Sequence, residues 1–90
     1  MAAEALRPLV FALSESRSLA EAICREAGLP LAPLEEREFE SREFKLRPLV
    51  SVRDRRVVVV QTLAHTDARP IAERLVRLAF LLATLRDAGA

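Results

Sequence analysis

The predicted fold is decided by the segment Arg55-Arg56-Val57-Val58-Val59-Val60-Gln61. Four consecutive β-branched valines show neither the stripe of an amphipathic helix nor the alternation of a strand with one wet face. Such a run is typical of a strand buried on both faces in a parallel sheet that helices cover. We therefore expect a central strand near 56–61, with a neighbouring strand on each side and helices above and below.

The chain before the valines predicts a strand followed by a helix. Leu9–Leu13 is continuously apolar and is expected to form a strand near 8–13, parallel to the valine strand. A helix near 18–27 follows, opened by the capping box of Ser18 and Glu21. Its inward face is expected to carry five apolar residues at helical spacing: Leu19, Ala20, Ile23, Cys24 and Ala27.

A charged region separates this helix from the valines and predicts a β-hairpin. We expect a strand near 33–38, a turn around 40–42 and an edge strand near 43–50, because Pro48 disfavours a central position. The carboxylates of the hairpin alternate with basic residues. We interpret them as a solvated face rather than as a general acid and base pair.

A second helix is expected near 70–87. Glu73, Arg74 and Arg77 mark a solvent-facing side in its first half. Leu78–Ala83 has no polar side, and a helix that is apolar all round is usually buried all round.

One small domain cannot easily wrap such a helix, so the sequence predicts a homo-oligomer. The expected contact residues lie in the second helix: Leu78, Phe80, Leu81 and Leu82. The strand near 43–50 is a competing interface, but Lys45, Arg47 and Pro48 guard it against strand pairing.

Composition places the chain among globular proteins. Its 90 residues are enough for one small domain over 1–90. A net charge of +1 with interspersed signs gives no case for nucleic acid or a membrane surface. The single cysteine, Cys24, cannot form an internal disulfide, and no signal peptide or membrane-spanning run is seen. We expect a cytoplasmic protein.

No group of residues in the sequence predicts a catalytic or metal site. His65 is the only histidine, and Asp67 alone beside it does not make a metal site. Arg53, Arg55 and Arg56 could bind a phosphate or lie at a subunit contact, although charged turn residues are the favoured interpretation.

The order of these elements resembles the N-terminal domain of ribose-phosphate pyrophosphokinase, also called phosphoribosyl pyrophosphate synthetase. The resemblance runs from about Leu9 to Ala90 and implies a three-layer α/β fold, with a mostly parallel sheet, flanking helices and a charged β-hairpin. This is the N-terminal half of a phosphoribosyltransferase-like architecture. The segments that carry the resemblance are Leu19–Ile23, Ser51–Arg53, Val58–Gln61 and Leu85–Ala90.

The resemblance implies a role in nucleotide chemistry. Family members use Mg-ATP and move its β,γ-diphosphoryl group to the 1-hydroxyl of ribose 5-phosphate, and they work as oligomers. A Phe-Ser-Asp-Gly-Glu motif in the family's hairpin contacts the adenine bound by a neighbouring subunit. Here Phe39 and Glu43 match the ends of that motif, while Ser41 and Arg42 replace its Asp and Gly. Phe39 and Glu43 are therefore the expected adenine contacts, with packing of Phe39 against Phe44 as the alternative.

The family's catalytic loop, metal-proximal segment and phosphate-cradling loop all follow the position matched by Ala90. This chain has two glycines, Gly28 and Gly89, and each is expected to end a helix. We therefore expect no catalytic or metal residues and no activity of the chain alone, with its contribution limited to assembly and adenine contacts. The alternative is a stand-alone, non-catalytic oligomerisation or regulatory module of the same fold.

Overall fold

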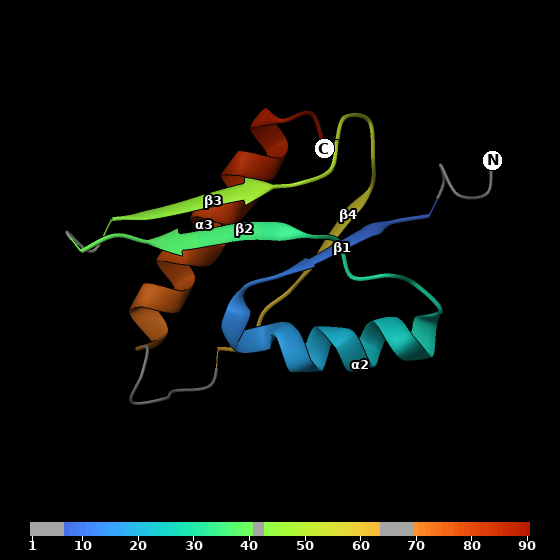
Figure 1. The fold of residues 1–90 in the computed structure, drawn as a ribbon, viewed down its shortest axis with the longest axis horizontal. Helices are drawn as coiled ribbons and strands as arrows, with labels where there is room; N and C mark the ends of the chain where they lie inside the picture. Colours follow the sequence, from blue (N-terminus) through green and yellow to red (C-terminus); the bar gives the residue numbers. More distant parts are fainter. Residues whose placement is uncertain (1–6, 41–42, 64–69) are drawn as a thin grey trace.

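The computed structural model describes residues 7–40, 43–63 and 70–90. Figure 1 shows helix α2 on one side of strands β1 and β4, with the β2–β3 hairpin and helix α3 on the other side. This arrangement confirms the predicted α/β class. The elements are β1 (Leu9–Ala12), the short 3-10 helix η1 (Ser14–Ser16), α2 (Arg17–Ala27), β2 (Leu34–Glu38), β3 (Phe44–Pro48), β4 (Val57–Val60) and α3 (Ile71–Asp87).

Strands β1 and β4 are parallel neighbours, as predicted, with Leu9 opposite Val57 and Ala12 opposite Val60. The central strand is β1 rather than β4. Beyond its pairing with β4, β1 is bridged by Leu31 on its other side. The expectation that the valine strand is central and buried on both faces is therefore wrong. Among the described residues β4 has a strand on only one side. Helix α2 packs mainly on β1, so Val58, which is paired with Val10 on that face, remains 44% exposed.

The hydrophobic core lies on the face of β1 that is turned toward α3 and the hairpin. Phe11 and Leu13 of this face are 0% exposed, as expected for strand residues whose side chains project into a packed layer. Val10 and Ala12 point to the opposite face, which α2 covers. The core residues are Phe11, Leu13, Ala32, Leu46, Val52, Leu81 and Leu85, with Leu9, Leu34, Phe44, Val50, Val57 and Val59 packed against them.

Helix α2 differs from its prediction at its start and along its surface. It begins at Arg17, with Ser16 as its N-cap and no capping bond from a side chain, so the predicted capping box of Ser18 and Glu21 is wrong. Among the five residues predicted to face inward, Ala20 and Cys24 are buried, whereas Leu19, Ile23 and Ala27 are exposed. The sheet beneath α2 is too narrow to cover the whole apolar face of the helix.

The charged hairpin is confirmed. Strands β2 and β3 pair antiparallel, from Leu34 opposite Pro48 to Glu38 opposite Phe44. Across the strands, the Glu35 carboxylate lies 3.0 Å from Arg47 and 3.6 Å from Lys45. Lys45 and Arg47 are largely exposed and Glu35 is half-buried, so each pair contributes at most about 1 kcal/mol. The basic residues on this side of the hairpin are thus solvated, as expected.

Helix α3 is turned differently from the prediction. Arg74 and Arg77, expected in solvent, are only 3% and 2% exposed. Leu81 and Leu85 lie on the same side and reach the core, while Phe80 and Leu82 are exposed. The arginines are buried because each finds polar partners at the junction with the hairpin and β4, as described below.

The turn before β4 is fastened to the end of α3. Asp54 has a left-handed backbone with φ 58°, and its amide donates to the Gly89 carbonyl oxygen over 2.9 Å. Asp is among the few residues other than glycine that tolerate this conformation. Gly89 itself has φ 102°, and an added Cβ would lie 3.1 Å from Arg53 Cγ.

The described helices include none that is long and apolar enough to cross a bilayer.

Candidate functional site

The tip of the hairpin presents an aromatic ring. Phe39 follows β2 directly, and its amide donates to the Glu43 carbonyl oxygen over 2.7 Å, which closes the hairpin. The ring is 44% exposed, and the Arg37 guanidinium lies 5.6 Å from its centroid. Phe39 and Glu43 are thus neighbours at an exposed tip, while the Ser41 and Arg42 positions lie outside the described residues. An exposed ring beside a cation can stack on a flat, anionic ligand.

The ring contact of Phe44 is with Phe80 of α3. Their centroids are 5.1 Å apart at an interplanar angle of 69°, which is a favourable edge-to-face arrangement. This contact fastens the base of the hairpin to α3. Phe39 is therefore not required to fill space around Phe44.

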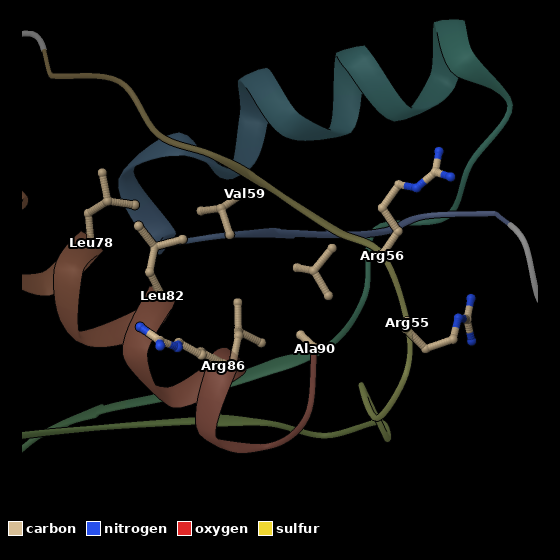
Figure 2. A pocket seen from close by; sticks show the side chains of 9 residues that line it. Arg55, Arg56, Val59, Leu78, Leu82, Arg86 and Ala90 are labelled. Atoms are coloured by element: carbon tan, nitrogen blue, oxygen red, sulfur yellow. The ribbon is translucent and has the colours of Figure 1, made fainter.

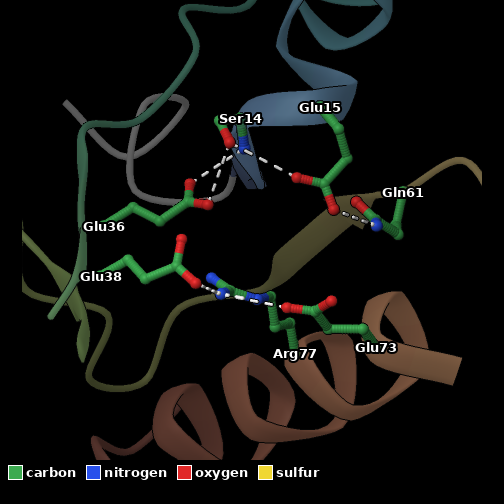
Figure 3. A network of polar contacts seen from close by, with 7 residues as sticks. All are labelled: Ser14, Glu15, Glu36, Glu38, Gln61, Glu73 and Arg77. Atoms are coloured by element: carbon green, nitrogen blue, oxygen red, sulfur yellow. Dashed lines mark hydrogen bonds and ion pairs between the residues drawn. The ribbon is translucent and has the colours of Figure 1, made fainter. Parts of the chain in front are cut away.

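A polar cluster lies where the two parallel strands end. Ser14 follows β1 and Gln61 follows β4, and Glu15 and Glu36 complete the group in Figure 3. The Ser14 amide and hydroxyl donate to the Glu36 carboxylate over 2.9 and 3.1 Å. The Gln61 side-chain amide donates to Glu15 over 3.0 Å.

The Ser16 side chain links the ends of β1 and β4. Its hydroxyl, 1% exposed, donates to Gln61 Oε1 over 2.8 Å and accepts the Thr62 amide over 2.9 Å. Because the Ser16 hydroxyl is used in this way, it is not available to cap α2. None of these contacts was predicted from the sequence. The signal was the polar residue directly after each buried strand, because the carboxyl ends of parallel strands meet at one edge.

Arg77 is the centre of a second polar network (Figure 3). Its Nη2 atom lies 3.1 Å from Glu38 Oε1 and 3.5 Å from Glu73 Oε1. The guanidinium also lies 4.5 Å from the centroid of the Phe44 ring. Arg74, one turn earlier, donates to both the carbonyl and the hydroxyl of Thr62 over 3.1 Å. These bonds explain how a helix can direct two arginines inward.

A small cavity of about 240 Å³ lies between the two networks. Its carboxylates are already engaged, because Glu36 accepts from Ser14 and Glu38 pairs with Arg77. Across the described parts of the chain, no group of three or more His, Cys, Asp or Glu side chains could hold a metal ion. We therefore assign the polar networks a structural role, which is to join the hairpin, the strand ends and α3. The cavity is lined by Ser14, Arg17, Leu34, Glu36, Arg37, Glu38 and Arg77.

A larger cavity, of about 450 Å³, lies between β4 and α3. Figure 2 shows Leu78 and Leu82 directed from α3 toward Val59, with Arg55 and Arg56 at the end of the cavity where β4 begins. Of the three turn arginines considered above, Arg55 donates to the Arg7 carbonyl oxygen over 3.0 Å. The walls are mostly aliphatic and the charges lie at the rim.

The other residues considered in the sequence are Cys24, His65 and Asp67. Cys24 is a free, buried thiol on the inner side of α2, as the sequence predicted. His65 and Asp67 lie outside the described residues.

These features together define an α/β domain in which a parallel strand pair lies between helices and a charged hairpin projects an aromatic ring. The family described as the N-terminal domain of ribose phosphate pyrophosphokinase matches residues 8–90. The chain belongs to this family.

Individual relatives agree with this assignment. The ribose-phosphate pyrophosphokinase of Ureaplasma parvum is 30% identical over 82 residues, which cover 91% of this chain and 24% of that protein. A putative ribose-phosphate pyrophosphokinase of Streptomyces coelicolor is 32% identical over 81 residues, or 90% of this chain and 24% of the relative. The chain thus spans about a quarter of the length of these curated relatives.

A solved structure shows the same fold. The crystal structure of phosphoribosylpyrophosphate synthetase from Mycobacterium smegmatis superposes with a TM-score of 0.80 at 21% identity. The superposition covers 93% of this chain and 27% of that one.

Proposed function

We propose that this chain is a non-catalytic N-terminal unit of the ribose-phosphate pyrophosphokinase type, which contributes self-association and an adenine contact. In the proposed arrangement the hairpin tip of one copy reaches adenine bound at a neighbouring copy. The family reaction, diphosphoryl transfer from Mg-ATP to ribose 5-phosphate, then requires groups that this chain does not supply by itself.

The observation that carries the adenine contact is the exposed Phe39 ring. It stands at the tip of the hairpin, 44% exposed, with the Arg37 guanidinium 5.6 Å from its centroid. Stacking on an aromatic ring contributes about 1–3 kcal/mol per base. Glu43, held beside the ring by the main-chain bond to Phe39, can accept a hydrogen bond from the adenine amino group.

Magnesium enters the family reaction, but the described part of this chain offers no cluster to bind it. Glu36 and Glu38, the carboxylates nearest the strand ends, are held by Ser14 and Arg77.

Replacing Phe39 by alanine is expected to weaken ATP binding by tenfold or more, because a stacking surface worth about 1–3 kcal/mol is removed. Saturation-transfer NMR on the adenine protons, followed by calorimetric titration, measures this change. Val76→Ala is the control, because Val76 is also a large exposed apolar residue on α3, whereas Phe80 holds the hairpin to α3 through Phe44. Equal ATP affinity in the wild type and Phe39→Ala, or an equal loss in both variants, would refute the contact.

A second candidate function is that of a stand-alone oligomerisation module. It is favoured by the outward side of α3, which exposes large apolar residues of the kind that mark association sites. Of the contact residues expected from the sequence, Leu78, Phe80 and Leu82 remain available to a partner, whereas Leu81 is 0% exposed and belongs to the core. Self-association that is unaffected by ATP, in a protein whose Phe39 makes no nucleotide contact, would favour this candidate.

A further inference from the structure

We propose that Arg77 of α3 is the positioning residue of the adenine contact, because it fixes the end of the hairpin from which Phe39 projects. This proposal rests on the adenine contact proposed above and names the side chain outside the hairpin on which that contact depends. Arg77 itself does not touch the ligand. It acts through Glu38 and Phe44, which form the last rung of the β2–β3 ladder before the tip.

One guanidinium contacts both strands of the hairpin at this rung. Glu38 is the last residue of β2 and lies opposite Phe44, the first residue of β3. Arg77 Nη2 lies 3.1 Å from Glu38 Oε1 (Figure 3), and the guanidinium lies 4.5 Å from the centroid of the Phe44 ring. The next main-chain bond, from the Phe39 amide to the Glu43 carbonyl oxygen, closes the tip. Phe39 is thus one residue away from the point at which α3 holds the hairpin.

Arg77 and the Phe39 ring lie on opposite faces of the hairpin. Successive side chains of a strand point to opposite faces, so Glu38 points toward α3 while Phe39 points outward. Arg37, two residues before Phe39, shares the outward face, and its guanidinium lies 5.6 Å from the ring centroid. Arg77 is 2% exposed and cannot reach a ligand that stacks on the outward ring. Any effect of Arg77 on nucleotide binding must therefore pass through the hairpin.

The hairpin is held by hydrophobic packing near its base and by polar and ring contacts near its tip. Leu46 lies in the hydrophobic core and Leu34 packs against it. At the last rung, Arg77 and Phe80 of α3 both contact the Phe44 ring, and Arg77 also holds β2 through its ion pair. A two-stranded ribbon by itself is marginally stable in water and twists strongly. The Arg77 contacts therefore limit the directions in which the tip can swing.

The burial of Arg77 favours a role in positioning over a role in stability alone. Its side chain is buried, yet its Nε atom has no hydrogen-bond partner among the described residues. A buried donor without a partner is destabilising, and hydrophobic residues of similar volume often replace buried ion pairs with no loss of stability. An apolar side chain could not supply both a directed bond to Glu38 and a planar cation over Phe44. The arginine is thus better suited to fixing a direction than to adding stability.

Fluorescence of a Phe39→Trp variant tests the proposal on the whole chain, which has no other tryptophan. Stacking of adenine on the introduced indole should quench its emission, and a titration then gives the dissociation constant of ATP. Adding Arg77→Met keeps an unbranched side chain beside Phe44 but removes the bond to Glu38. This second change should raise the dissociation constant about fivefold or more, because the tip is then in its binding position for a smaller fraction of the time. The fluorescence anisotropy of the indole should fall.

Three further variants in the same background separate positioning from a loss of folding or of charge. Arg86→Met changes an exposed arginine on the same helix and should leave both readouts unchanged. Glu38→Ala removes the same ion pair from its 50% exposed partner, so the domain should stay folded. This variant gains positive charge, which by itself would favour ATP, yet it should bind ATP more weakly. Arg77→Lys keeps the charge and should restore part of the affinity. Circular dichroism and urea unfolding check that each variant is folded.

The outcomes distinguish the positioning role from the adenine contact itself. A dissociation constant and an anisotropy that change with neither Arg77→Met nor Glu38→Ala would overturn the positioning role and leave the adenine contact intact. Absence of quenching by ATP in the Phe39→Trp variant, together with equal ATP affinity of the wild type and Phe39→Ala, would overturn both. An equal loss of affinity in Arg86→Met would also count against Arg77, because the effect would then follow from net charge.

Discussion

Replacing Leu81 by glutamate is expected to unfold the protein, whereas the same change at the adjacent Phe80 leaves it folded. Leu81 is 0% exposed and lies in the core, and Phe80 is 54% exposed. An unpaired buried carboxylate, added to the loss of a buried leucine, should lower the free energy of unfolding by more than about 4 kcal/mol. A small domain has only about 5–15 kcal/mol in total.

Circular dichroism and urea titration of both variants make this comparison. Leu81→Ala is a milder companion, with an expected loss of about 2–5 kcal/mol from the cavity that it creates. A folded Leu81→Glu protein, or a Phe80→Glu protein as damaged as Leu81→Glu, would show that α3 faces the core with a different side.

Removing the Arg77 side chain is the second change with a large expected effect. Arg77→Ala should lower the free energy of unfolding by about 2–4 kcal/mol. It removes the bonds to Glu38 and Glu73 and the contact of the guanidinium with the Phe44 ring. This loss of stability is smaller than that from breaking a fully buried ion pair. Glu38 and Glu73 are 50% and 44% exposed, so water can solvate their carboxylates once Arg77 is removed.

Thermal or urea unfolding measures this loss, with Arg86→Ala as the matched control. Arg86 is an exposed arginine on the same helix, and its removal should change stability by no more than about 0.5 kcal/mol. Arg77→Lys should be intermediate, because lysine keeps the charge but lacks the planar group that lies over the ring. Equal stability of Arg77→Ala and Arg86→Ala would mean that the network does not hold the hairpin to α3.

Local patterns predicted the order of elements well. The apolar runs placed β1 and β4 and their parallel pairing, and charge with Pro48 placed the hairpin. These elements could be predicted because the periodicity of apolar residues and the turn residues are local features of the sequence. The family resemblance was confirmed for residues 8–90.

The errors arose where a side chain depends on partners that are distant in sequence. Arg74 and Arg77 have the pattern of a solvent-facing side, but Thr62, Glu38 and Phe44 meet them in the fold. Periodicity identifies the faces of a helix and does not say which charges find buried partners. The valine strand was placed at the centre because its composition suits burial on both faces, whereas its burial also depends on what lies at its open edge.

The site was predicted less completely than the fold. Phe39 and Glu43 came from a motif resemblance, and the structure places them together at the hairpin tip, but their contact with adenine remains a prediction. The contacts of Ser14, Ser16 and Gln61 were not foreseen, because they join residues 22 to 46 positions apart in the sequence. A cytoplasmic location likewise remains a prediction.

We infer that this family member assembles and contacts nucleotide but does not carry out the family reaction alone. The most direct test is an assay of the purified 90-residue chain with Mg-ATP and ribose 5-phosphate, followed by chromatographic detection of phosphoribosyl pyrophosphate and AMP. We predict no product above a protein-free blank, at protein concentrations where the chain is folded and associated. Product that rises in proportion to the amount of protein, and that persists through repeated purification, would contradict the account.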